Sequence, residues 1–209
     1  MLPRVSSAPP LTTAAHTLTI EEWAELPDDQ SGELVDGRLE EEEVTDTGHE
    51  LIVLWLARQV GNWLAGKGGV VLGSDAKYRV RANRGRKPDL AVFLPGGKRA
   101  PRTALVRIPP EIMVEVVSAR PRDGRRDRIE KAVEYASFGV RWYWLLDPQL
   151  QSLEVWELRD GVYAHVLAAS ESKVTDIPGC PELVLDLDEL WSELELLGPE
   201  EPEPESETP

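Results

Sequence analysis

The sequence predicts an α/β or α+β fold in which a mixed β-sheet is flanked by helices. Two observations predict it: strand-like apolar runs fill the second half of the chain, and segments with helical spacing of apolar residues precede and interrupt them. At 209 residues the chain fits one domain that buries roughly two-thirds of its unfolded surface. We predict one domain over residues 18–197, between disordered tails at 1–17 and 198–209 that are rich in Pro and in Ser/Thr/Ala or Glu.

Four helices are expected, in the segments 19–26, 47–69, 124–138 and 186–197. The first two begin with predicted capping boxes, Thr19 with Glu22 and Thr47 with Glu50. The second helix is the most regular, because its apolar residues recur at helical spacing until a run of glycines ends it.

A hairpin is expected around Asp36-Gly37, a dipeptide that suits a type I′ turn. Further strands are expected at 78–81, 89–94, 111–118, 140–147, 152–158 and 162–168. The segment Val140–Asp147 is apolar on both faces apart from Arg141, which predicts a central strand.

The net charge of -15 conceals a strongly uneven distribution. Residues 21–50 contain 13 acids and one base, residues 75–131 contain 16 Lys/Arg against 7 Asp/Glu, and residues 182–209 contain 11 acids and no base. The basic middle segment indicates a surface that faces a polyanion, or, alternatively, bases that neutralise the protein's own acidic flanks.

The single cysteine, Cys180, excludes a disulfide framework and is typical of a reducing compartment. The first residues lack the apolar core of a signal peptide, and no uncharged apolar run reaches about 18 residues. We therefore expect a soluble cytoplasmic protein that has no membrane partner. Three histidines and one cysteine make a structural zinc site improbable.

The expected strand at 111–118 places a carboxylate, Glu115, between Val114 and Val116. An ionised carboxylate in an apolar setting needs a cation or hydrogen-bond donors. Asp89 opens the neighbouring expected strand, so the two carboxylates would approach each other in a suitable register and could hold Mg²⁺ or Mn²⁺. The alternatives are a solvated sheet margin for Glu115 and a loop-ending role for Asp89.

The helix expected after this strand places Asp127, Lys131 and Tyr135 at i, i+4 and i+8, on one face. The opposite residues are expected to pack against the sheet: Ile129, Ala132, Val133 and Ala136. A lysine amine on this helix could orient a water molecule or stabilise negative charge on a phosphate. An ordinary surface ion pair between Asp127 and Lys131 is the alternative.

Three stretches, "GELVDG", "RKPDLAVF" and "PPEIMVEVVSARPRDGRRDRIEKAVEYASFGVRWYWLLDP", resemble the Uma-two family of restriction-endonuclease-like proteins. That family belongs to the PD-(D/E)XK nuclease superfamily. The resemblance extends from about Thr19 to Leu190 and implies a single restriction-endonuclease-like nuclease domain. By this resemblance, Asp89 and Glu115 are the metal-binding acids, with the Val116 main-chain carbonyl as a further ligand.

The superfamily usually has a lysine two residues after the second acid, where this chain has Val117. The family pattern implies that Lys131 has taken over this role. It also implies a metal contact through water for Glu33 and a recurring position for His49, for which local hydrogen bonding at a helix start is the alternative. Asp127 and Tyr135 are supporting residues, and DNA backbone contacts are expected from Arg120, Arg122, Arg125, Arg126 and Arg128.

The resulting expectation is an endonuclease that hydrolyses phosphodiester bonds of nucleic acid, DNA rather than RNA, with Mg²⁺ or Mn²⁺ as cofactor. One alternative is an inactive nuclease-like domain that binds DNA or protein, since Val117 replaces the usual lysine. Another is a protein-interaction domain with an acidic partner. A homodimer is a further expectation, with Trp142 and Trp144 or the solvent side of the sheet as candidate interfaces.

Overall fold

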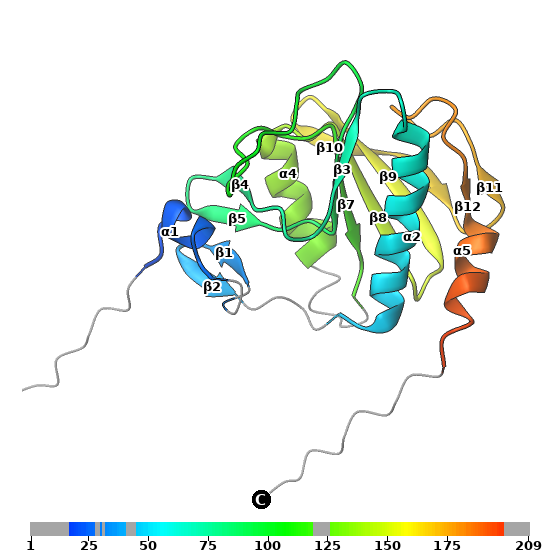
Figure 1. Ribbon diagram of the computed structural model, residues 1–209, viewed down its shortest axis with the longest axis horizontal. Coiled ribbons are helices and arrows are strands. Elements are labelled where there is room, and N and C mark those ends of the chain that lie inside the picture. Colours follow the sequence, from blue (N-terminus) through cyan, green and yellow to red (C-terminus); the bar gives the residue numbers. More distant parts are fainter. Residues whose placement is uncertain (1–16, 28–29, 31, 41–44, 119–125, 199–209) are drawn as a thin grey trace, which may run out of the picture.

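The computed structural model describes residues 17–27, 30, 32–40, 45–118 and 126–198 (Figure 1). Its helical elements are α1 (Ile20–Ala24), α2 (Thr47–Leu64), the π-helical turn η1 (Arg126–Lys131), α4 (Ala132–Phe138) and α5 (Leu187–Leu194). Its strands are β1 (Glu33–Val35), β2 (Arg38–Glu40), β3 (Val70–Leu72), β4 (Tyr78–Arg81), β5 (Arg84–Arg86), β6 (Leu90–Phe93), β7 (Ile112–Val116), β8 (Trp142–Asp147), β9 (Ser152–Arg159), β10 (Val162–Ala169), β11 (Lys173–Val174) and β12 (Leu185–Asp186).

The main sheet is mixed and has the strand order β10-β9-β8-β7-β6-β3. Strands β7 and β8 are parallel, whereas the other neighbouring pairs are antiparallel. The helix that connects β7 to β8 accounts for the parallel pair, because parallel strands need a crossover connection. Every residue of β8 is buried, so the prediction of a central strand is confirmed.

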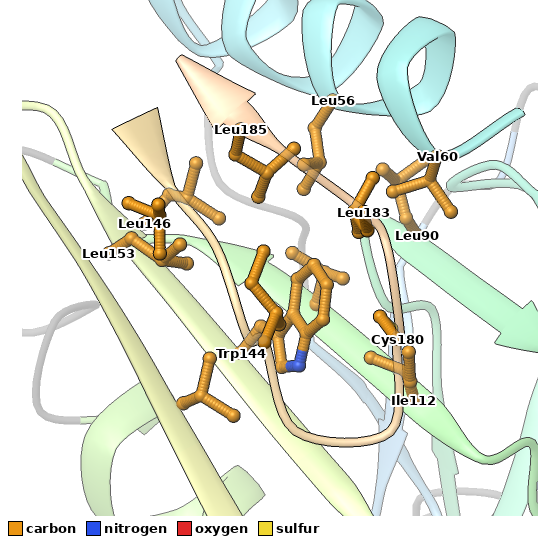
Figure 2. Packing of buried hydrophobic residues seen from close by; sticks show 14 of the residues in the cluster. Leu56, Val60, Leu90, Ile112, Trp144, Leu146, Leu153, Cys180, Leu183 and Leu185 are labelled. Atoms are coloured by element: carbon orange, nitrogen blue, oxygen red, sulfur yellow. The ribbon is translucent and has the colours of Figure 1, made fainter. Parts of the chain in front are cut away.

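Helices cover both faces of the main sheet (Figure 1). One face packs against α2 and α5, and Figure 2 shows Leu56 of α2 near Trp144 and Leu146 of β8 within this core. The other face packs against α4 and strand β4. Alternation along β7 puts Val114 in the first core and Met113 in the second, so Glu115 projects toward the α4 side.

A smaller sheet, ordered β2-β1-β5-β4, lies beside α4 and contains the predicted hairpin. Asp36 and Gly37 have φ angles of 49° and 80°, which confirms the type I′ turn. Helix α1 packs on this sheet through Trp23, whose ring lies 2.2 Å from the position of a Cβ at Gly85, so only glycine fits there. Its capping box is present as predicted.

The third expected helix is present over its described residues, 126–138, and begins with a π-helical turn. Two expectations were wrong. Asp46, not Thr47, caps α2, because the Asp46 carboxylate accepts the His49 amide hydrogen bond at 2.7 Å. Trp142 and Trp144 are only 6% and 0% exposed, so they cannot supply a dimer interface.

The two predicted tails lie outside the described residues, apart from Thr17 and Gly198. Within the described ranges, no helix combines the length and the apolar character needed to cross a membrane.

Candidate active site

The register between β6 and β7 brings the two predicted acids together. Leu90 pairs with Val114 and Ala91 with Met113, and one further step along the same antiparallel register places Asp89 opposite Glu115. Side chains of directly opposed residues lie on the same face with Cβ atoms roughly 5 Å apart. Asp89 and Glu115 therefore lie at the same end of the sheet.

Glu115 receives one donor at each carboxylate oxygen. The Lys131 amine lies 2.8 Å from Oε2, and the Tyr135 hydroxyl donates to Oε1 at 2.5 Å. Glu115 is 2% exposed and Lys131 is 5% exposed, so both charges are removed from water. The lysine is the counter-charge that a buried strand carboxylate requires.

Asp127 forms the second ion pair with Lys131, and its Oδ1 atom lies 3.0 Å from the amine. Of the residues expected to pack against the sheet, Ile129 and Val133 are 54% and 55% exposed, whereas Ala132 packs against the core and Ala136 is partly buried. The face with Asp127 and Lys131 is the buried one. The packing prediction was wrong for Ile129 and Val133 because the strand beneath the helix presents a carboxylate that needs the lysine more than it needs apolar cover.

Asp89 contacts His49 and the main chain of Val116, which are both predicted site residues. Its Oδ2 atom accepts the Val116 amide hydrogen bond at 2.6 Å and lies 3.3 Å from Nε2 of His49. Amide and carbonyl of one strand residue face the same neighbouring strand, so the Val116 carbonyl also faces the edge that Asp89 approaches. Burial alone lowers the pKa of His49, but the hydrogen bond and charge of Asp89 outweigh it and raise the pKa above the ordinary value.

Glu33 is held within a buried network that the sequence did not reveal. Arg86, with no exposed area, donates to Glu33 Oε2 at 2.6 Å and to both oxygens of Glu134 at 2.6 and 3.1 Å. The other oxygen of Glu33 accepts the Lys87 amide at 3.0 Å. Both Glu33 oxygens are thus engaged by the protein, and a metal contact of Glu33 through water stays a prediction.

One signal for this network was present in the sequence. Asp127, Lys131, Glu134 and Tyr135 are spaced i, i+4, i+7 and i+8, which is the periodicity of a single helix face. The apolar residues on the opposite side of the helix are the ones that the pattern predicts to pack against the sheet. Arg86 alternates along β5 with the small residue Gly85, and nothing in that pattern distinguishes it from the exposed arginines nearby.

The predicted DNA-contacting arginines are only partly described. Arg120, Arg122 and Arg125 lie outside the described residues. Burial raises the pKa of Asp127 and opposes the lowering of the Glu33 pKa; the charge of Arg126 acts to lower both, less strongly than Lys131 does. Arg128 pairs with Asp147 and Glu154, each at 2.7 Å, and its contact with DNA stays a prediction.

The basic middle segment does not form one surface around the site. Strand β6 leads away from Asp89 and β7 returns to Glu115, so the loop 94–111 lies at the opposite end of the sheet, among the green loops of Figure 1. The exposed bases of this loop are Lys98, Arg99, Arg102 and Arg107. These bases therefore lie at the other end of the sheet from Glu115.

Several carboxyl groups of the described residues act on one another at the site. Burial raises the pKa of Glu115 well above its ordinary value; Lys131 opposes this rise, whereas Asp89, Asp127 and Glu33 add to it. Burial lowers the pKa of Lys131, but Glu115 and then Glu33, Asp127 and Asp89 outweigh it, so the pKa lies well above the ordinary value and the amine is a cation. A further cation would relieve the repulsion among these acids.

The donor set fits a magnesium-like ion better than a tightly ligated transition metal. Among the described residues, no group of three or more His, Cys, Asp or Glu side chains is arranged to hold a metal ion. Mg²⁺ needs only one or two carboxylates because it keeps several waters. Asp89 and Glu115, with the Val116 carbonyl, are the predicted donors; both Glu115 oxygens accept hydrogen bonds from Lys131 and Tyr135, so metal binding by this set stays a prediction.

Comparisons with known proteins agree with this architecture. The model of the Uma2 family, described as "Putative restriction endonuclease", matches residues 19–188. The crystal structure of a "putative nuclease belonging to DUF820" from Anabaena variabilis has a TM-score of 0.65 and 18% identity, over 85% of this chain and 99% of that one. No curated protein matches the chain. With a match across most of its length, the chain belongs to the Uma2 family of restriction-endonuclease-like proteins and has a nuclease fold.

Proposed function

We propose that the protein is a Mg²⁺- or Mn²⁺-dependent endonuclease that hydrolyses phosphodiester bonds of DNA. The observation that carries the proposal is the meeting of Asp89 and Glu115 at one sheet end, with the Lys131 amine 2.8 Å from Glu115. The family membership supports a nuclease-like activity, and the metal and the substrate are our own assignments.

Asp89 and Glu115 would hold the ion, together with the Val116 carbonyl. The bound ion would supply a water of lowered pKa and would stabilise charge on the scissile phosphate. The Val116 amide orients Asp89, because its hydrogen bond fixes Oδ2. Tyr135 orients Glu115 in the same way through Oε1.

Lys131 acts as a cation and not as a general base. Its pKa is raised well above the ordinary value by Glu115 and the neighbouring acids, despite burial, so it stays protonated at neutral pH. A protonated amine next to Glu115 can donate hydrogen bonds to the attacking water or to a phosphate oxygen. Lys131 thereby fills the role that Val117 cannot perform, since Val117 is an apolar residue that is 6% exposed.

Cleavage of a covalently closed plasmid in Mg²⁺ tests this proposal. We expect nicked and linear products from the wild type and a loss of about 10- to 100-fold in rate for D89N, as is usual when the support of a metal site is removed. D75N is the matched control, because Asp75 is a fully exposed aspartate outside the proposed metal site. The D75N protein should cleave at the wild-type rate. Parallel reactions with single-stranded DNA and with RNA define the substrate. Equal rates for D89N and the wild type would refute the metal site.

A second function is favoured by one observation, the burial of valine at the position of the usual lysine. A nuclease-like domain without catalysis would bind DNA or protein and would be indifferent to metal. Calorimetric titration with Mg²⁺ separates the two functions: the nuclease binds the ion and D89N does not, whereas a binding module shows no Mg²⁺ binding in either form.

A further inference from the structure

The buried Arg86 network connects two separate parts of the structure beneath the site. Glu33 comes from β1 of the small sheet, and Glu134 comes from α4, which packs on the main sheet. Arg86 is bound to both, with a forked contact to Glu134 and a single contact to Glu33. Glu134 lies three residues after Lys131, so the two residues occupy neighbouring turns on the same side of the helix.

Arg86 brings Glu33 to the part of the helix that carries Lys131. It binds both Glu33 and Glu134, and Glu134 lies about one turn after Lys131 on the same side of the helix. Burial raises the pKa of Glu33, and the charge of Lys131 acts in the opposite direction. Even so, the ion pairs of Lys131 are with Glu115 and Asp127, and within the described part of the chain none is with Glu33. The Glu33 oxygens instead receive Arg86 and the Lys87 amide.

A network of this kind is not needed for stability alone. Buried ion networks are often no more stable than well-packed apolar residues of similar volume, because desolvating the charges costs so much. The small sheet already has an apolar core of its own around Trp23 and Leu34, and β4 joins the core beneath α4 through Tyr78 and Val80. Joining the small sheet to the main sheet therefore does not explain why a charged residue is buried at position 86.

We propose that Arg86 is a positioning residue that retains Glu33 on β1 and so keeps the Lys131 amine on Glu115 and Asp127. Without Arg86, the Glu33 carboxylate would be buried without its bound cation, and Lys131 is a cation whose charge already acts on it. The amine would then move away from Glu115, where the reaction needs it. The placement of the side chains follows from geometry, whereas the effect on cleavage rests on the proposed function.

The tests use R86M, which removes the charge and keeps the side-chain length, and R84M as the matched control. Arg84 also binds Glu134, but its other partner is Asp36 and not Glu33. In a crystal structure of R86M, we expect the Glu33 carboxylate within hydrogen-bond distance of the Lys131 amine. In R84M, Glu33 should keep its wild-type position.

Kinetics provide the second readout. We expect kcat for plasmid cleavage to fall about 10²-fold in R86M, as for a displaced catalytic group, while the half-saturating Mg²⁺ concentration changes by less than about threefold because the metal-binding acids remain. Adding E33Q to R86M should restore most of the lost rate, because the competing charge is gone. Adding E134Q should not.

If R86M does not fold, R86K replaces it in these tests. Its single ammonium group keeps the positive charge but cannot make the paired contact to Glu134, so we expect the same changes to a smaller extent. The inference is overturned if Glu33 and Lys131 keep their wild-type contacts in R86M, or if E33Q and E134Q restore the rate equally. A wild type without cleavage activity would overturn the proposed function alone, because the crystal structures still decide where Arg86 holds Glu33.

Discussion

Replacing Lys131 with methionine removes one charge and keeps the side-chain length. It leaves Glu115 and Asp127, which are 2% and 1% exposed, without their shared cation. A charge pair at 2.8 Å interacts with a gross energy of about 6 kcal/mol at an effective dielectric constant of about 20. The net cost of removing one partner from a buried pair is about 3–5 kcal/mol. That cost is a large share of the total stability of a domain, about 5–15 kcal/mol.

Urea unfolding at pH 7, followed by tryptophan fluorescence, measures this loss. For a domain of this size the melting temperature should also fall by about 6–20 °C. The difference from the wild type should narrow as the pH is lowered, because protonation removes the unpaired charges and burial has already raised the pKa values of Glu115 and Asp127. Adding E115Q and D127N to K131M should recover most of the stability. An unchanged midpoint for K131M, or no recovery in the triple variant, would refute the reasoning.

Three further outcomes follow from the same contacts. Y135F removes the donor to Glu115 Oε1 and should lose about 1–3 kcal/mol in urea unfolding, with Y163F as a control that leaves Glu115 untouched; equal losses would contradict a specific role of this bond. His49 has a raised pKa, so its contribution to stability is complete below pH 6.5 and is lost as the pH rises above that value; H49Q should lack this decline in unfolding experiments between pH 6 and 9, and an unchanged pH profile would argue against the pairing with Asp89. DNA binding measured against salt should lose about one unit of slope for each phosphate contact removed; if R128A leaves the slope unchanged, Arg128 serves Asp147 and Glu154 and not DNA.

The strands from β6 to β10 were predictable because their sequence signals are local, whereas the short strands β3, β5, β11 and β12 were not expected. Val140–Asp147 is apolar on both faces, and a strand that is buried on both faces takes a central position in the sheet. The Asp36-Gly37 turn was predictable for the same reason, since its two positive φ angles favour this dipeptide. The alternation along β7 also placed Glu115 on a defined face before any pairing was known.

The register and the buried helix face were not predictable from local signals. Nothing in the sequence fixes Asp89 opposite Glu115, because a shift of one residue would move Asp89 to the other face. The exposure of Ile129 and Val133 follows from the tertiary contact between Lys131 and Glu115, which outweighs the local preference for burying apolar residues. Arg86 is a similar case, because its partners Glu33 and Glu134 are 53 and 48 residues away along the chain.

Anomalous diffraction from crystals soaked in Mn²⁺ tests the metal site most directly. We expect one peak between the carboxylates of Asp89 and Glu115, with oxygen ligands at about 2.1–2.2 Å, and no such peak in D89N. A wild-type crystal without density at this position in millimolar Mn²⁺, or with its only peak elsewhere, would contradict the account.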